Sequence, residues 1–126
     1  MKKMLLLITL LFIQFSCKNR EDLQMNQVLK IEFQHFHGCP NSKKLMQNLK
    51  NAMKDYEDRI VLTEIIVDTQ ELAIKYKFRG SPTILINGKD LEGITEPNEP
   101  SLTCRLYAND LPGTEEIKAK IIESLK

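Results

Sequence analysis

Residues 28–36, VLKIEFQHF, followed by 37–42, HGCPNS, decide the fold because the pattern changes abruptly between them. In the first stretch the apolar residues Leu29, Ile31 and Phe33 alternate with polar ones. Such alternation is typical of a strand with one face turned to a core. The first stretch therefore predicts a strand, and the second predicts the point at which the strand gives way to a helix.

The turn after this strand holds Cys39 between a glycine and a proline. Gly38 and Pro40 predict a tight, exposed turn, and Pro40 also suits the first turn of a helix, where its missing N–H costs nothing. Apolar residues then recur at helical spacing, which predicts an amphipathic helix with lysines on its outer face. This helix is expected to run from Asn41 or Ser42 to about Tyr56.

The rest of the chain alternates strands with helices. Residues 60–67, IVLTEIIV, are β-branched and almost continuously apolar. This pattern is typical of a central parallel strand that is buried on both faces. Further along we expect a short helix over 69–77, a strand over 83–86, a hairpin turn at Asn87-Gly88, a weak partner strand over 90–93, a long loop over 94–113 and a last helix capped by Thr114. The order predicts a single α/β domain over residues 28–126.

Composition excludes several classes of protein. The chain has 126 residues, with 18 basic and 17 acidic residues and a net charge of +1. A charge so close to zero excludes a nucleic-acid binder that acts through bulk positive charge, so no nucleic-acid partner is expected. Apolar residues recur along the whole chain, which excludes a disordered tail protein. Three cysteines are too few for a disulfide-scaffolded miniprotein, and their spacing provides no four-ligand zinc set.

The N-terminus has the parts of a secretory signal, a short positive region followed by about ten apolar residues. Residues 14–17, QFSC, resemble the cleavage site of bacterial lipoproteins, in which the cysteine becomes the lipid-carrying N-terminus. The resemblance implies a signal peptide over residues 1–16, lipidation of Cys17, and a polar tether over 17–27. An ordinary signal peptide with an incidental cysteine is the alternative. We therefore expect a bacterial cell-envelope protein, facing the periplasm or the cell surface and held at the membrane by its lipid.

Two motifs make the domain resemble the thioredoxin-like superfamily. His37-Gly38-Cys39-Pro40-Asn41-Ser42 lies where that family has its redox motif, and Gly80-Ser81-Pro82-Thr83 lies where it has a cis-proline before its third core strand. The chain is most similar to small bacterial proteins with GCPN, GSPT and an SCRLY-like segment, some of them loosely labelled alkylmercury-lyase-like. Thr103-Cys104-Arg105-Leu106-Tyr107 matches the last segment. The resemblance implies a thioredoxin-like βαβ-ββα fold, a mixed sheet flanked by helices.

The resemblance also assigns roles to residues. Cys39, at a helix N-terminus that favours the thiolate, would be the nucleophile of thiol–disulfide exchange. Ser42 stands where a dithiol enzyme has its resolving cysteine, so Cys104, in the long loop, would take that role. Pro82 would fix its turn and keep a backbone edge open to the partner. The expected substrate groove consists of His37, Pro40, Ser81 and Arg105.

The residues leave other readings open. Cys39 and Cys104 could form a redox-active pair, form a static disulfide or remain unpaired. The protein could instead capture a soft metal or an organomercurial through its thiolates, or be a non-catalytic module that binds proteins in its groove. No cofactor and no resident metal site are expected, although His35, His37 and Cys39 alternate. The expected partner is a protein that carries a thiol or a disulfide, or a small thiol.

Overall fold

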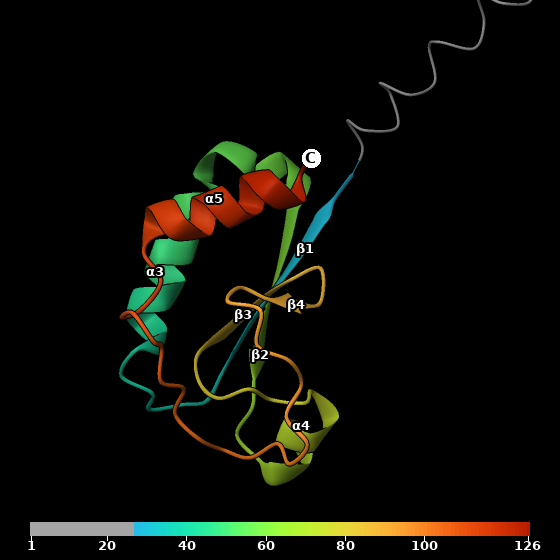
Figure 1. The fold of residues 1–126 in the computed structure, drawn as a ribbon, viewed down its shortest axis with the longest axis vertical. Helices are drawn as coiled ribbons and strands as arrows, with labels where there is room; N and C mark the ends of the chain where they lie inside the picture. Colours follow the sequence, from blue (N-terminus) through green and yellow to red (C-terminus); the bar gives the residue numbers. More distant parts are fainter. Residues whose placement is uncertain (1–26) are drawn as a thin grey trace, which may run out of the picture.

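The computed structural model describes residues 27–126 (Figure 1). Its elements follow the order expected from the sequence: strand, helix, strand, helix, hairpin and helix. They are β1 (Leu29–His35), α3 (Ser42–Met53), the 3-10 helix η2 (Lys54–Arg59), β2 (Ile60–Ile66), α4 (Gln70–Lys75), β3 (Thr83–Ile86), β4 (Lys89–Asp90) and α5 (Thr114–Ser124). The predicted signal peptide, Cys17 and all but the last residue of the tether lie outside the described residues.

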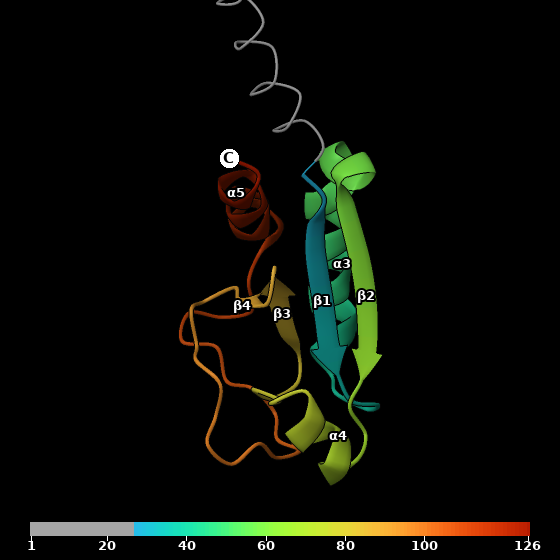
Figure 2. The ribbon, with the colours of Figure 1, turned by 90° about the vertical axis from the view of Figure 1, so that its right-hand side faces the viewer.

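The four strands form one mixed sheet in the order β2-β1-β3-β4. β1 pairs in parallel with β2 and antiparallel with β3, and β4 pairs antiparallel with β3. α3 connects the two parallel strands, as a parallel pair requires. Figure 2 shows α3 behind β1 and β2, with α5 beside the sheet and α4 at the end where β1 and β2 finish. The predicted fold class, a mixed sheet flanked by helices, is confirmed.

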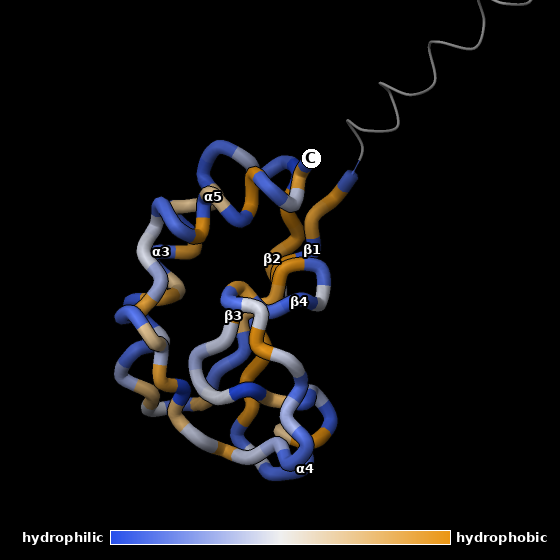
Figure 3. Tube along the Cα trace, viewed as in Figure 1, coloured by the Kyte–Doolittle hydropathy of each residue, from blue (hydrophilic) through white to orange (hydrophobic). Residues whose placement is uncertain are grey.

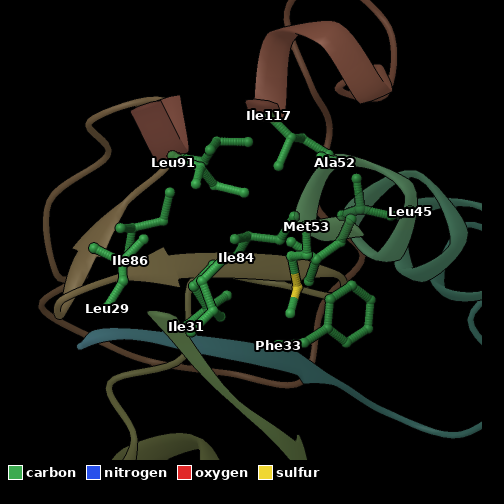
Figure 4. Packing of buried hydrophobic residues seen from close by; sticks show 13 residues of the cluster. Leu29, Ile31, Phe33, Leu45, Ala52, Met53, Ile84, Ile86, Leu91 and Ile117 are labelled. Carbon is green, nitrogen blue, oxygen red and sulfur yellow. The ribbon is translucent and has the colours of Figure 1, made fainter. Parts of the chain in front are cut away.

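The main core lies between the sheet and the helices α3 and α5. Leu29, Ile31 and Phe33 of β1, the expected inward face, are fully buried. In Figure 4, side chains from β1, β3, α3 and α5 meet in this cluster, with Leu45 and Ala52 on α3 and Ile117 on α5. Figure 3 shows apolar stretches along the strands and alternating apolar and polar positions along α5. A second, smaller cluster of Val67, Ala73 and Phe78 lies beneath α4.

One strand is placed differently from the prediction. β2 is an edge strand, and β1 is the central one. Val61 in β2 is 54% exposed, which a central strand buried on both faces would not allow. The nearly continuous apolar run has another cause, because Leu62 packs against the main core and Ile65 against the cluster beneath α4. Two separate clusters thus make an edge strand apolar on both faces.

Three boundaries also differ from the prediction. The first long helix ends at Met53, and its expected last turn is the 3-10 helix η2. Thr114 is the first residue of α5 rather than its cap, because Gly113 occupies the N-cap with an extended backbone. β4 begins at Lys89, directly after the two-residue turn. Asn87 and Gly88 both have positive φ, as the tightest hairpin turns require.

None of the described helices, which lie within residues 27–126, is long and apolar enough to span a membrane.

Candidate functional site

Cys39 lies in the turn between β1 and α3, two residues before the N-cap Asn41. Gly38 has a φ of +82°, a left-handed conformation that glycine adopts readily, and this turns the chain sharply. The turn itself is exposed, as expected, including Pro40. Cys39 is not exposed with it, because only 9% of this residue is accessible. The exposed turn is therefore confirmed, but the cysteine within it is buried.

The surroundings of Cys39 favour its charged form. Burial raises the pKa of the thiol, but hydrogen bonds from Ser42, Ser81 and the backbone N–H groups of Asn41 and Ser42 outweigh this and lower it. The Ser42 hydroxyl is buried and makes no hydrogen bond within residues 27–126 while the thiol is neutral. A thiolate would give this hydroxyl an acceptor. A thiol whose pKa is lowered in this way can act as a nucleophile or as a soft-metal ligand.

Ser81 connects Cys39 to the long loop. The Cys39 Sγ donates to the Ser81 carbonyl at 3.6 Å, and the Arg105 N–H donates to the same oxygen at 2.9 Å. The Ser81 N–H in turn donates to the Thr103 carbonyl at 2.9 Å. The Ser81 hydroxyl accepts a hydrogen bond from the Phe36 N–H at 3.2 Å. One buried serine therefore joins the end of β1, the thiol and the loop.

Cys104 lies directly beside this serine. Its backbone forms an isolated parallel β-bridge with Ser81, and its side chain is exposed. Cys39 and Cys104 are both free thiols in the structure. The backbone next to Cys104 and the Cys39 sulfur thus share one carbonyl acceptor. A sulfur–sulfur bond between the two cysteines stays a prediction.

Pro82 follows a cis peptide bond, as the resemblance implied. Its carbonyl accepts a hydrogen bond from the Tyr107 hydroxyl at 2.6 Å. The backbone edge that Pro82 was expected to keep open is not open, because Thr103 and Arg105 occupy both polar backbone groups of Ser81. The reason is that the long loop runs beside Ser81 as a short parallel strand.

Arg105 was expected in the substrate groove, but the structure directs its side chain inward. The guanidinium is 3% exposed and forms a bidentate ion pair with Asp90, one of whose bonds measures 2.8 Å. It also donates to the Thr83 hydroxyl at 3.2 Å and lies 4.5 Å from the centre of the Tyr107 ring. Burial raises the pKa of Asp90, but the hydrogen bonds and positive charge of Arg105 lower it by more. The net shift of the Asp90 pKa is therefore downward. This ion pair fixes the long loop to the hairpin. The sequence analysis did not identify Asp90 as part of the site, because the weak strand pattern around it does not indicate an ion pair with Arg105.

The His37 side chain is exposed and contacts a carboxylate. Its Nδ1 lies 2.5 Å from the Asp68 carboxylate, and it is not among the groups that shift the pKa of Cys39. The His37 N–H donates to the same carboxylate and is the main cause of its lowered pKa. His35 contacts a different carboxylate, that of Glu64, at 2.7 Å. Within residues 27–126 no three His, Cys, Asp or Glu side chains cluster as a metal site.

Among the cavities, one of about 490 Å³ lies between the β3–β4 hairpin and α5, and a second, of about 420 Å³, lies beside the first turn of α3 and is not lined by Cys39 itself. The second cavity runs between the first turn of α3 and the segment after Cys104. Its lining residues are Asn41, Lys44, Arg105, Leu106, Tyr107, Asp110 and Leu111. Leu106, one of these residues, is 91% exposed.

Known structures of similar fold include two thioredoxins and a malarial protein. A structure titled only as that of a malarial protein is 17% identical, with a TM-score of 0.53, over 79% of this chain and 100% of the other. Thioredoxin-2 of the malaria parasite is 18% identical, with a TM-score of 0.52, over 76% and 82%. Chloroplastic thioredoxin z is 15% identical, with a TM-score of 0.51, over 83% and 88%.

At such identities the likeness shows the fold alone, and the fold is thioredoxin-like. No protein of curated function matches the sequence. A family match covers the strands, the site and most of the long loop, from residue 29 to residue 111. The chain therefore belongs to the family described as Domain of unknown function (DUF2703).

Proposed function

We propose that the protein is a membrane-anchored thiol protein that carries out thiol–disulfide exchange, with Cys39 as the nucleophile and Cys104 as the resolving thiol. The observation that carries the proposal is the arrangement around Ser81. A buried thiol with a lowered pKa and the backbone beside a second free thiol contact the same carbonyl group. The thioredoxin-like fold is consistent with this chemistry but does not by itself establish it.

The exchange proceeds in two steps. The Cys39 thiolate attacks one sulfur of a substrate disulfide, the substrate S–S bond breaks, and the leaving thiolate takes a proton from water. The Cys104 thiolate then attacks the Cys39 sulfur, which releases the second half of the substrate as a thiol. Two electrons have passed to the substrate, and the protein holds a Cys39–Cys104 disulfide. A dithiol reductant returns it to the starting state.

The anchor is the second part of the proposal, and the sequence supports it. The apolar run that ends at Ser16-Cys17 supports a lipid on Cys17, which would hold the domain at a bacterial cell-envelope membrane. The compartment outside the inner membrane is oxidising, so disulfides are available there as substrates. The partner is accordingly a disulfide-bearing protein or a small thiol compound of the envelope.

A trapping experiment tests the exchange. The full chain carrying Cys17→Ala, reduced and in detergent, is mixed with oxidised glutathione and examined by intact mass and peptide mapping. With Cys104 present we expect glutathione to be released and a Cys39–Cys104 disulfide to form. With Cys104→Ala added, the glutathione adduct should persist on Cys39, because the resolving thiol is missing.

Two further variants serve as controls. Cys39→Ala should take up no glutathione at position 39, and Ser42→Cys combined with Cys104→Ala should release the adduct again. The last result is expected because residues 39 and 42 are joined by one turn, in which the Ser42 N–H contacts the Cys39 carbonyl. An adduct that is equally stable with and without Cys104 would exclude Cys104 as the resolving thiol.

A further inference from the structure

The backbone next to Cys39 is fully occupied by the chain itself. From the Gly80 carbonyl to the Pro82 carbonyl there are four polar backbone groups, and each has a partner. The Gly80 carbonyl accepts from the Thr83 hydroxyl at 2.7 Å, and the Pro82 carbonyl accepts from Tyr107 at 2.6 Å. The N–H and the carbonyl of Ser81 are bonded to Thr103 and Arg105. A partner strand that adds to a sheet needs free groups of this kind.

The occupying segment is firmly held. The Arg105 side chain is anchored in the buried ion pair with Asp90, and Tyr107 is bonded to Pro82. Gly80 completes the contact, because a Cβ there would lie 3.0 Å from the Arg105 Cβ and 3.1 Å from its Cα. Displacing the segment would leave the Asp90 carboxylate buried without its cation, which is strongly destabilising. The segment is therefore a fixed part of the site.

Little of the thiol-bearing residue is accessible, because only 9% of Cys39 is exposed. A cavity of about 420 Å³, which Cys39 itself does not line, lies between the first turn of α3 and the segment after Cys104. This volume lies in the range of small-molecule pockets. The cavity is lined by Asn41, Lys44, Arg105, Leu106, Tyr107, Asp110 and Leu111. A cavity of this size takes a small molecule more readily than an extended chain.

We propose that Cys39 exchanges with low-molecular-weight disulfides and discriminates against disulfides within extended polypeptides. The inference rests on the proposed function and narrows its substrate class. The step is the one already written: the Cys39 sulfur bonds to one sulfur of the small disulfide, and the other sulfur leaves as a thiolate that takes a proton from water. Unlike an added strand, a small disulfide needs none of the backbone groups that the Thr103–Arg105 segment occupies.

Two probes with the same leaving group test the substrate class. One is N-acetylcysteine methylamide joined through a disulfide to thionitrobenzoate, and the other carries the same disulfide at the centre of an extended peptide. The full chain with Cys17→Ala and Cys104→Ala attacks each probe, and the released thionitrobenzoate is followed by absorbance. Rates are divided by those of mercaptoethanol with the same probes. We expect a normalised preference for the small probe of about tenfold or more.

The outcomes separate the two proposals. A preference near one, or a preference for the peptide, would overturn the inference while leaving Cys39 as the nucleophile. No reaction of Cys39 with either probe, in folded protein, would overturn the proposed function itself. The peptide probe therefore tests the substrate class, and the small probe tests the nucleophile.

A double variant tests whether the closed edge is the cause. Asp90→Asn with Arg105→Gln removes both buried charges together and should loosen the segment, so the preference for the small probe should fall. The matched control, Asp55→Asn with Lys118→Gln, removes an ion pair of 3.1 Å at the other end of the molecule and should leave the preference unchanged. If the first variant does not fold, Tyr107→Phe removes only the bond to Pro82. An unchanged preference in folded variants would exclude the edge as the cause.

Discussion

Cys39 combines burial with a lowered pKa, two properties that ordinarily oppose each other. The balance is decided by donors, since the two backbone N–H groups and two hydroxyls around the sulfur outweigh the cost of burial. Ser42 is the donor that depends on the charge of Cys39, because its buried hydroxyl makes no other hydrogen bond within the described residues. Ser42, which stands where a dithiol enzyme has its second cysteine, thus stabilises the thiolate of Cys39.

The first prediction concerns the pH dependence of Cys39. Because its pKa lies below the ordinary value, alkylation by iodoacetamide should rise with pH and level off at a lower pH than for a free thiol. Ser42→Ala removes one donor to the thiolate, so the whole curve should move to higher pH. The rate at pH 7 should fall about fivefold, as expected for a loss of about 1 kcal/mol. Stopped-flow alkylation of the reduced Cys17→Ala, Cys104→Ala protein measures it.

Ser124→Ala is the matched control, because this serine lies near the end of α5 and bonds only to its own helix. Its alkylation curve should coincide with that of the parent protein. A Cys39 curve that levels off at the pH of a free thiol, or that does not move with Ser42→Ala, would contradict the account of the site.

At the scale of residues, the sequence predicts what local chemistry determines. Cys39 and Pro82 lie in motifs whose glycine and proline neighbours indicate their turns directly. The ion pair of Arg105 with Asp90 could not be predicted in this way, because the sequence does not distinguish a buried arginine from an exposed one. Only the meeting of the loop with the hairpin shows that Arg105 faces inward. Ser81 is similar, since its partners come from three distant segments.

At the scale of elements, the short segment Thr103–Arg105 pairs with Ser81 like a strand, although it does not belong to the main sheet. Its bridge to Ser81 is a single pair. Such a bridge depends on how closely the two backbones approach, and Gly80 sets that approach through its missing side chain and its φ of +105°. The glycine before Ser81 thereby positions Cys104.

Replacing this glycine tests the contact. Gly80→Ala should lower the free energy of unfolding by about 3 kcal/mol, since left-handed strain and the clash with Arg105 add together. Gly93→Ala is the control, because it has a similar left-handed φ of +78° but open space around it. It should cost only about 1 kcal/mol. Urea unfolding of both variants gives the comparison, and equal losses would show that the close approach is not tight.

Among the elements, those with a clear period are predicted well. β1 alternates and β3 is fully buried, and the structure has both where the sequence puts them. β2 shows the limit, because a continuous apolar run does not tell a central strand from an edge strand that contacts two clusters. The start of α5 shows a second limit of prediction from sequence. Gly113 and Thr114 are both acceptable N-cap residues, and the path of the preceding loop selects the glycine.

At the scale of the whole molecule, the anchor gives the last prediction. Cells that express the full chain should incorporate labelled palmitate into it, whereas Cys17→Ala should abolish the label and release the protein from the membrane fraction. The cause is the loss of the only thiol that follows the apolar run directly. Cys104→Ala should keep the label. Equal labelling of all three proteins, or labelling of none, would contradict lipidation at Cys17.

The direction of β1 has a consequence for how such an anchored protein would stand on its membrane. Figure 1 shows the chain entering the domain near the C-terminus, at the end opposite to α4, and β1 runs from there toward Cys39. A seven-residue strand spans about 23 Å. Under the proposed anchoring, the thiol would therefore lie at the end of the domain opposite to the one where the tether enters. It would meet compounds that diffuse freely through the envelope before it meets anything embedded in its own bilayer.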